Sequence, residues 1–333
     1  MKLSRSKKIT KKMESDSKEV FVEFFATSRV LKSILGFAIS FFCIYLLKNE
    51  MAALPQDLQF SMFSLSFLTL SVLFACIGQF SRALRWSKMI NLAGGTTNNY
   101  EVLSAYFKSV LANNLLPLRA GDILRATYYG QKFSESPMKG TLIIISERIL
   151  DVMFLAIIVG IVFYQPALDF LMRFANDFSL LSFGLMLAGA SLLIYTLWAS
   201  PKAKTILGKC GDFFRQLSFA NSDRFSLVVY TLLIWIFEAI AYYFAMQSLG
   251  LDITFTKCLI LMSVVTLSTS IPSTPGYFGT FHLVFIETLQ VIEPTLEVSF
   301  LAAISIHMVL WLTSNSIGVL FIVIDFGMRR IRA

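Results

Sequence analysis

The segment "LANNLLPLRAGDILRA", residues 111–126, gathers groups that can bind an anion in an otherwise apolar chain. Arg119 and Arg125 carry guanidinium groups, which match phosphate oxygens because their planar fork donates two parallel hydrogen bonds. Asp122 can cap the helical run that follows it, and Gly121 allows the backbone to turn sharply. Asp122 is also near enough to Arg125 to pair with it on one helix face. The pattern therefore indicates either a grip for an anionic headgroup or a purely structural Arg–Asp network.

A second charged cluster lies in "ISERILDVMF", residues 145–154. Glu147 and Asp151 are four residues apart and Arg148 lies between them, so two carboxylates and a cation share one end of a long helix. Ionisable groups near a bilayer are costly and usually face the protein interior or a cavity. We expect these groups to pair with the arginines of the first segment. A structural network and a substrate site are equally compatible with that pairing.

The third segment, "STSIPSTPGYFGTFH" (residues 268–282), contains two prolines and two glycines that break a helix. Ser270, Ser273 and Thr274 can supply hydroxyl groups to the freed backbone. If the second half-helix begins near Gly276, its N-terminal N–H groups would favour an anion. The segment does not resemble a nucleotide-binding P-loop, because it lacks the Gly-Lys-Ser/Thr ending.

Isolated polar residues complete the set: Glu238 and His307 in predicted spans, and His282 after the third segment. Each is interpreted first as a buried, hydrogen-bonded group and second as part of a candidate proton relay, because membrane proton pathways use such residues.

The basic stretch "SRALRWSKMI" is interpreted differently, as a helix end whose long side chains extend to the membrane interface. Its cations are Arg82, Arg85 and Lys88.

Few residues favour metal or covalent chemistry. The four cysteines are scattered and there are two histidines, so the sequence predicts no metal site and no cofactor. No nucleophile or donor-binding loop stands out, and we expect no catalytic residues and no enzyme activity.

Composition defines the broad class. Hydrophobic residues make up 56% of the 333 residues, charged residues 15%, and the mean hydropathy is +0.69. Soluble proteins have about 25% charged residues, so this is a polytopic, all-α membrane protein. We expect a basic cytosolic tail over 1–29, a transmembrane domain over 30–326 and a basic cytosolic C-terminus over 327–333. The tail is expected to touch anionic lipid headgroups and not nucleic acid.

Six apolar runs are long enough to cross a bilayer, which takes about 20 residues. They cover approximately residues 30–47, 58–81, 139–164, 178–199, 225–249 and 298–325. The intervening basic loops alternate with loops that are not basic, and the positive-inside rule then predicts that both termini are cytoplasmic.

Two further apolar stretches, 101–136 and 254–291, are interrupted by polar turns that contain proline. We interpret them as re-entrant helical hairpins that enter from opposite faces, because broken backbone at membrane depth must lie in protein or line a cavity. Inverted-repeat transporters place such helices at a midplane site. An inverted repeat stays open, as does the alternative of two Pro-kinked crossings, which would give eight spans.

The order "NNLLPLRAGDILRA", "SERILDV" and "PSTPGYFGT" resembles the transmembrane region of lysylphosphatidylglycerol synthases, the flippase-like family, from about residue 30 to 326. The matching residues are Asn114, Pro117, Arg119, Gly121, Asp122, Arg125, Glu147, Arg148, Asp151, Pro272, Pro275, Gly276 and Gly279. Tyr277 departs from the family where a second Gly is usual, and His282 departs where an acidic residue is common.

The resemblance implies a protein of the bacterial or archaeal cytoplasmic membrane that is associated with moving lipids between leaflets. In the synthases, this region is linked to flipping aminoacylated phosphatidylglycerol, and a separate cytosolic domain makes that lipid. We expect no such domain in this sequence. The resemblance and the polar segments together predict substrate-binding residues, at Asn114, Arg119, Asp122, Arg125, Glu147, Arg148, Asp151, Ser273, Thr274 and Gly276.

The leading hypothesis is a lipid translocase that moves an anionic or phosphate-bearing headgroup between leaflets of the bacterial inner membrane through a polar midplane cavity. Its partners would be phospholipids or polyprenyl-phosphate lipids. Two alternatives stay open: an accessory subunit of cell-envelope glycolipid assembly, which would contact envelope-biosynthesis enzymes, and a membrane enzyme with Glu147 or Asp151 as general base.

Overall fold

The computed structural model describes residues 37–48, 64–116, 119–134, 136–162, 208, 221–269, 274–294 and 300–332. Within these ranges every regular element is helical, and no strand occurs. Three helices are long and apolar enough to cross a membrane: Leu65–Leu92, Phe225–Ser248 and Ala302–Met328. The described chain therefore confirms the all-helical membrane class.

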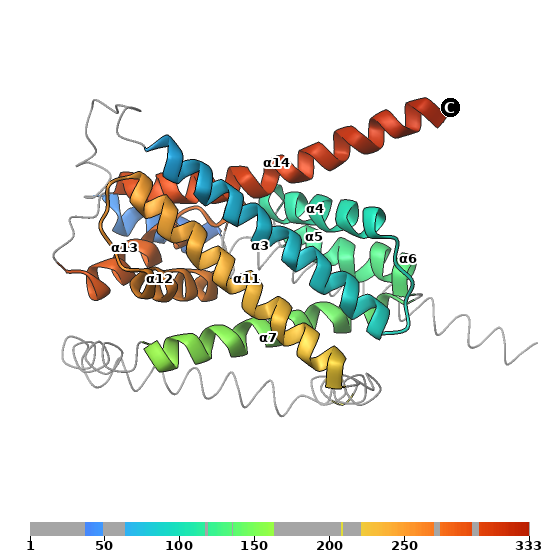
Figure 1. The fold of residues 1–333 in the computed structure, drawn as a ribbon. Helices are drawn as coiled ribbons and strands as arrows, with labels where there is room; N and C mark the ends of the chain where they lie inside the picture. Colours follow the sequence, from blue (N-terminus) through green and yellow to red (C-terminus); the bar gives the residue numbers. More distant parts are fainter. Residues whose placement is uncertain are drawn as a thin grey trace, which may run out of the picture.

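Helices α3 (Leu65–Leu92) and α11 (Asn221–Ser248) run side by side along most of their length (Figure 1). An aromatic ladder joins them, in which Phe74 stacks on Phe237 and Phe244 at ring-centroid distances of 6.0 and 5.7 Å. This contact buries the shared face of two helices that hydropathy identifies as spans, and it forms one wall of the molecule.

The first interrupted stretch folds as a helix, a break and a second helical piece, as predicted. Helix α4 covers Asn99–Leu115, and the chain resumes with α5 (Ala120–Leu124), the π-helical turn η3 (Arg125–Tyr129) and α6 (Gly130–Ser134). Residues 117 and 118, which include Pro117, lie outside the described residues.

Helix α7 (Pro137–Val162) follows with bounds close to those of the predicted span. It packs on η3 and α6, and also on α12, so it connects the two interrupted stretches.

The second interrupted stretch also consists of two short helices around a break. Helix α12 (Phe255–Ser268) is followed by a 3₁₀ turn, η4 (Pro275–Tyr277), and by α13 (Thr280–Ile292). The condition for an anion site at Gly276, that the second half-helix begins there, is not met, because α13 begins at Thr280. Gly276 and Gly279 both have positive φ, +71° and +88°, so a regular helix cannot start before Thr280.

Helix α14 (Phe300–Arg332) continues beyond the predicted span to Arg332 and packs along α4 (Figure 1). A Cβ atom at Gly318 would lie 2.8 Å from the carbonyl oxygen of Phe107, so glycine allows the close approach. Near the far end, Asp325 accepts hydrogen bonds from Tyr100 Oη at 2.5 Å and from Ser104 Oγ at 3.0 Å, and it pairs with Lys108. This network fixes α4 against α14.

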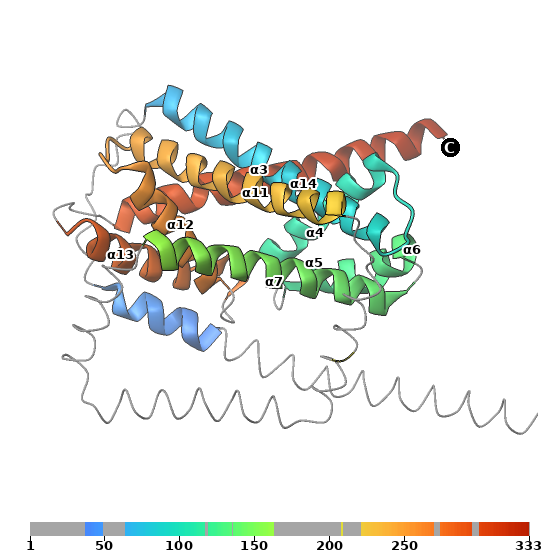
Figure 2. The ribbon, with the colours of Figure 1, turned by 60° about the horizontal axis from the view of Figure 1, so that its bottom comes forward.

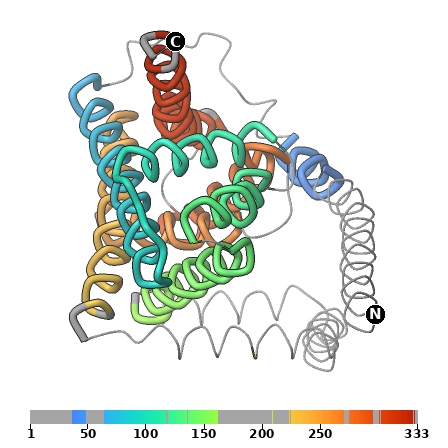
Figure 3. The backbone as a smooth tube through the Cα atoms, turned by 90° about the vertical axis from the view of Figure 1, so that its right-hand side faces the viewer, coloured from blue at the N-terminus to red at the C-terminus, as the bar shows by residue number. Residues whose placement is uncertain are grey.

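The arrangement places both interrupted stretches between the longer helices. Viewed from the end, α3 and α11 form one side, α14 lies above and α7 below (Figure 3). A helix at Phe37–Leu46 lies beside the second break (Figure 2), where Ser40 Oγ accepts a hydrogen bond from the Thr274 amide at 2.9 Å. The predicted span 178–199 and the N-terminal tail lie outside the described residues.

The second predicted span, like the last one, ends earlier than its helix. The second span was expected to end near residue 81, but α3 continues to Leu92. The charged residues that set the predicted end are accommodated inside the protein by acids on neighbouring helices.

Candidate functional site

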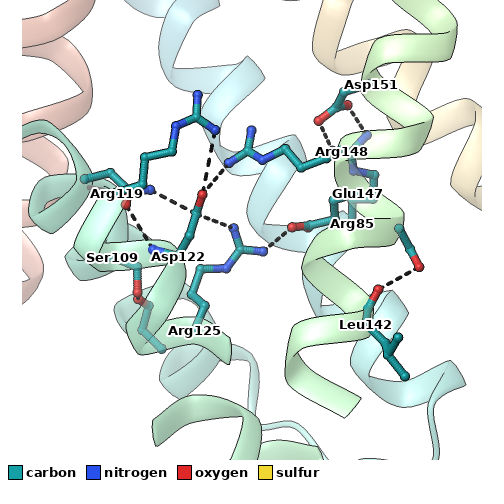
Figure 4. A network of polar contacts seen from close by, with 12 residues as sticks. Arg85, Ser109, Arg119, Asp122, Arg125, Leu142, Glu147, Arg148 and Asp151 are labelled. Carbon is teal, nitrogen blue, oxygen red and sulfur yellow. Dashed lines mark hydrogen bonds and ion pairs between the residues drawn. The ribbon is translucent and has the colours of Figure 1, made fainter. Parts of the chain in front are cut away.

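A network of neighbouring ion pairs joins α3, α5, η3, α7 and α11. The part of it around Asp122, Glu147 and Asp151 is drawn in Figure 4. It contains five guanidinium groups and four carboxylates, which leaves a formal surplus of one positive charge. The members are Arg82, Arg85, Arg119, Arg125, Arg148, Asp122, Glu147, Asp151 and Glu238.

Arg85 is the most buried cation of the network, with a side chain that is 3% exposed. Its Nη1 and Nη2 donate to the two carboxylate oxygens of Asp151 at 2.7 and 3.0 Å, and Nη1 also donates to Thr231 Oγ1 at 3.1 Å. The interpretation of this stretch as a helix end reaching the membrane interface is therefore wrong for Arg85. Lys88, one turn further on, does lie nearer the surface, where it pairs with Asp223.

Arg82 also points into the protein, against the same interpretation. Its Nη1 donates to Glu238 Oε2 at 2.5 Å, and its guanidinium lies 4.6 Å above the ring of Trp235. Glu238, a candidate for the proton relay, is thus the counter-ion of an arginine on the neighbouring helix.

Arg125 pairs with Glu147, and both side chains are 6% exposed. This bears out the expected pairing between the first two charged segments. The guanidinium also lies 4.6 Å from the Trp86 ring and 5.2 Å from the Tyr106 ring. Enclosed by these groups, Arg125 is part of the internal structure and is not exposed to a ligand.

Asp122 is the centre of the remaining contacts. One oxygen accepts from Arg148 Nη2 at 2.9 Å, the other accepts from Asn113 Nδ2 at 3.0 Å, and Arg119 and Arg125 lie at 3.9 Å. The expected capping role is wrong, because α5 already begins at Ala120. Asp122 instead holds several cations together.

The sharp turn before α5 occurs at Arg119, not at Gly121. Arg119 has a left-handed φ of 52°, whereas Gly121 is required for packing: a Cβ atom there would overlap the carbonyl oxygen of Ser109 on α4. Across the second break, Tyr277 also has a left-handed φ, of 61°. Among the described residues, these two are the non-glycine residues with positive φ.

Arg119 connects the two breaks. Its Nη2 donates to the carbonyl oxygen of Thr269 at 2.7 Å, and its guanidinium lies 5.7 Å from the ring of Tyr277. Left-handed backbone at a non-glycine residue costs about 1–2 kcal/mol and is concentrated at functional sites. Tyr277 therefore carries backbone strain at a position where its ring lies beside the guanidinium of Arg119.

A cavity of about 230 Å³ lies where these elements meet. The middle parts of α3, α11 and α14 contribute to its wall, so a bilayer around these three helices would surround it. Its charged lining residues are Arg82, Arg119, Arg148, Asp151 and Glu238. Arg119 and Arg148 are the more accessible cations, with side chains 30% and 46% exposed, and both share the carboxylate of Asp122.

Two buried histidines lie close together beside the second break, and one of them, His307, lines the cavity. The Gly279 amide donates to His282 Nδ1 at 3.3 Å, and His282 Nε2 lies 3.3 Å from His307 Nδ1. Because Nδ1 accepts a hydrogen bond, the neutral His282 ring carries its proton on Nε2. The pair thus stabilises the start of α13, and its role in proton transfer stays a prediction.

The other predicted residues lie nearby. Asn114 lines the cavity and donates to Asn315 Oδ1 at 3.1 Å. Thr274 Oγ1 donates to the carbonyl oxygen of Phe278 at 3.0 Å, which bears out its expected role toward the broken backbone. Gly276 packs under Trp311, and Ser273 lies outside the described residues.

Sequence reasoning missed Arg82 and Arg85 as members of the site. A signal for them was present in the sequence, because both arginines lie within the segment that continues beyond them as helix α3. In the part of the chain that the structure describes, no group of three or more His, Cys, Asp or Glu side chains could hold a metal ion.

Comparison with known proteins identifies the family. A family model described as the lysylphosphatidylglycerol synthase TM region matches residues 33–318, which include the whole ion-pair network and both breaks. Neither the curated proteins nor the solved structures gave a match. The chain, a multi-pass membrane protein, belongs to the lysylphosphatidylglycerol synthase transmembrane-region family.

Proposed function

We propose that this protein is a lipid translocase that moves an anionic or phosphate-bearing headgroup between the leaflets of the membrane. The observation that carries the proposal is the pair of accessible guanidinium groups on the cavity wall, Arg119 and Arg148, which share the single carboxylate of Asp122. A phosphate that approaches them would gain charge-assisted hydrogen bonds in a region of low dielectric constant.

The lengths of the broken helices support a re-entrant arrangement. Helices α12 and α13 have 14 and 13 residues, which at 1.5 Å per residue is about 20 Å each. A bilayer core is about 30 Å thick, so neither half crosses it alone. Because α12 and α13 also pack against each other, we propose that both interrupted stretches enter and return, with six full crossings and cytoplasmic termini.

The cavity offers a physical reason for the two interruptions of regular helix. Freed backbone groups are tolerable at membrane depth where they line a polar space, and transporters place their substrate sites at such breaks. A headgroup could pass between the two breaks while its acyl chains stay in lipid. The membrane lipids themselves are thus the proposed partners.

Lipid transfer into reconstituted vesicles tests this function. Acyl-labelled phosphatidylglycerol is incorporated into both leaflets, and a membrane-impermeant reductant then bleaches the outer-leaflet label. The wild-type protein should make the inner-leaflet label accessible. Arg119→Gln should slow that transfer by about tenfold or more, since it removes one charge-assisted grip worth about 1.5–3 kcal/mol.

The control is Lys88→Gln, which removes a cation of α3 that pairs with Asp223 away from the cavity. It should transfer lipid like the wild type. Arg125→Ala is not a suitable test, because it would leave Glu147 buried without a counter-ion and destabilise the fold. Unchanged transfer by a folded Arg119→Gln protein would refute the proposal that Arg119 binds the lipid headgroup.

A further inference from the structure

The two histidines of the chain meet beside the second break, in a contact that the proposed headgroup site does not use. His282 on α13 and His307 on α14 are 3% and 4% exposed. The distance between His282 Nε2 and His307 Nδ1 is 3.3 Å. His307 lines the cavity and His282 lies behind it, so the pair connects the cavity wall with the start of α13.

The hydrogen bonds of the pair determine where its protons lie. The Gly279 amide donates to His282 Nδ1 at 3.3 Å, so the neutral His282 ring carries its proton on Nε2 and donates it to His307 Nδ1. Both ring nitrogens that can accept a further proton are therefore occupied. A proton added to either ring must displace the Gly279 contact or the contact between the rings, and both contacts hold the start of α13 in place.

The protein side of the pair is mainly apolar. The Phe281 ring stacks on the His307 ring at a centroid distance of 4.2 Å. The titratable groups on the other sides are two thiols, an ion pair at the far end of α13 and an exposed carboxylate: Cys43, Cys258, Lys257 with Glu293, and Glu287. The remaining charges that face the pair belong to the cavity wall.

That wall carries more positive than negative charge. Three arginines stand against two acids, which leaves one positive charge in excess: Arg82, Arg119 and Arg148 against Asp151 and Glu238. The phenol rings of Tyr242 and Tyr277 also line the cavity. Burial and the excess positive charge both make a charged ring at His307 costly. A phosphate bound between Arg119 and Arg148 would offset that excess and lower the cost of a proton on the pair.

We infer that His282 and His307 form a proton-binding site that takes up one proton when an anionic headgroup enters the cavity. The inference rests on the proposed translocase function and names its coupled ion. Binding is reciprocal, because the anion and the proton each raise the affinity for the other by the same factor. A lipid with one negative charge that crosses together with this proton transfers no net charge across the membrane.

Proton uptake by the wild-type protein tests the inference. A short-chain phosphatidylglycerol is titrated into the protein in weakly buffered detergent micelles that contain an indicator dye. The phosphodiester keeps its single charge throughout the titration range of histidine, so a proton taken up on binding belongs to the protein. We expect such uptake, and an affinity for the lipid that is about tenfold higher at about pH 5.5 than at about pH 7.5.

The double variant His282→Gln with His307→Gln tests the residue assignment. Glutamine at position 282 keeps an acceptor for the Gly279 amide, as in an ordinary capping box, but neither glutamine takes up a proton. The ratio of the affinities at the two pH values should fall to about one. Glu287→Gln removes a titratable carboxylate from the same helix outside the cavity lining and should leave the wild-type ratio unchanged.

Vesicles with a pH difference across the membrane show whether the proton moves with the lipid. Relative to protein-free vesicles, phosphatidylglycerol should accumulate in the leaflet that faces the higher pH. A potassium diffusion potential of either sign should not shift its distribution, because the lipid and the proton together carry no net charge.

The outcomes separate this inference from the proposed function. Lipid binding without proton uptake would overturn the inference and leave the translocase function standing. A pH ratio that persists in the folded double variant would assign the proton to another group and remove the histidine pair from this role. A distribution that follows the electrical potential would show that the lipid moves without the proton, which also overturns the inference. No transfer at any pH by folded wild-type protein would refute the proposed function itself.

Discussion

The buried pair of Arg85 and Asp151 allows a quantitative test of what holds the site together. Replacing Asp151 by Asn keeps the shape of the side chain but removes its charge. Arg85 would then be a guanidinium that is 3% exposed and has neutral acceptors in place of a carboxylate: the amide oxygen of the new side chain and Thr231 Oγ1.

The expected cost follows from the desolvation of that cation. Breaking a buried ion pair by removing one partner costs about 3–5 kcal/mol, because the other charge stays buried without compensation. Replacing both partners by apolar residues is often close to neutral. We therefore expect Asp151→Asn to lower the free energy of unfolding by about 3–5 kcal/mol, and Arg85→Met with Asp151→Leu to recover most of that loss.

Unfolding in mixed micelles, followed by near-ultraviolet circular dichroism as the denaturing detergent fraction rises, measures these differences. The matched control is Lys88→Gln, which breaks a more exposed pair and should cost no more than about 1 kcal/mol. A loss below about 1 kcal/mol for Asp151→Asn would refute the reasoning. A double variant as unstable as the single one would do so too, since it would mean that packing and not charge governs the site.

Two further predictions concern the breaks. Gly121→Ala should lower the thermal unfolding temperature and reduce the free energy of unfolding by about 2 kcal/mol. The reason is that a Cβ atom there would overlap the carbonyl oxygen of Ser109 and force α4 and α5 apart. An unchanged unfolding temperature would contradict this packing. Tyr277→Phe keeps a ring beside Arg119 and should transfer lipid like the wild type. Tyr277→Gly relieves about 1–2 kcal/mol of backbone strain, which offsets part of the packing lost with the ring, and should transfer lipid more slowly. Equal transfer rates for the two Tyr277 variants would show that the ring does not position Arg119.

Several features of the site followed from the sequence because they depend on local patterns. Hydropathy identified the spanning helices, and prolines and glycines identified both breaks, since a helix that lacks donors or contains positive φ values must end. The pairing of Arg125 with Glu147 was also foreseeable, because a charge buried in lipid needs a counter-ion.

The sequence left the start of α13 open; it lies at Thr280 and not near Gly276. Glycine composition marks where a backbone can turn but not which glycine adopts which φ, which depends on the neighbouring helices. The left-handed φ values at Arg119 and Tyr277 were not predictable from the sequence either. Arginine and tyrosine both disfavour this conformation, and only contacts across the breaks maintain it.

The sequence by itself determined that this chain is an all-helical membrane protein with two polar breaks and more charge than lipid tolerates, because hydrophobicity and helix-breaking act over neighbouring residues. Tertiary structure alone decided which charges are neutralised. Arg82 meets Glu238 across 156 positions and Arg85 meets Asp151 across 66, so no local pattern records either pair. The physical reason is that burying a guanidinium is tolerable only where another helix brings a carboxylate within hydrogen-bonding distance, and that distance is set by packing.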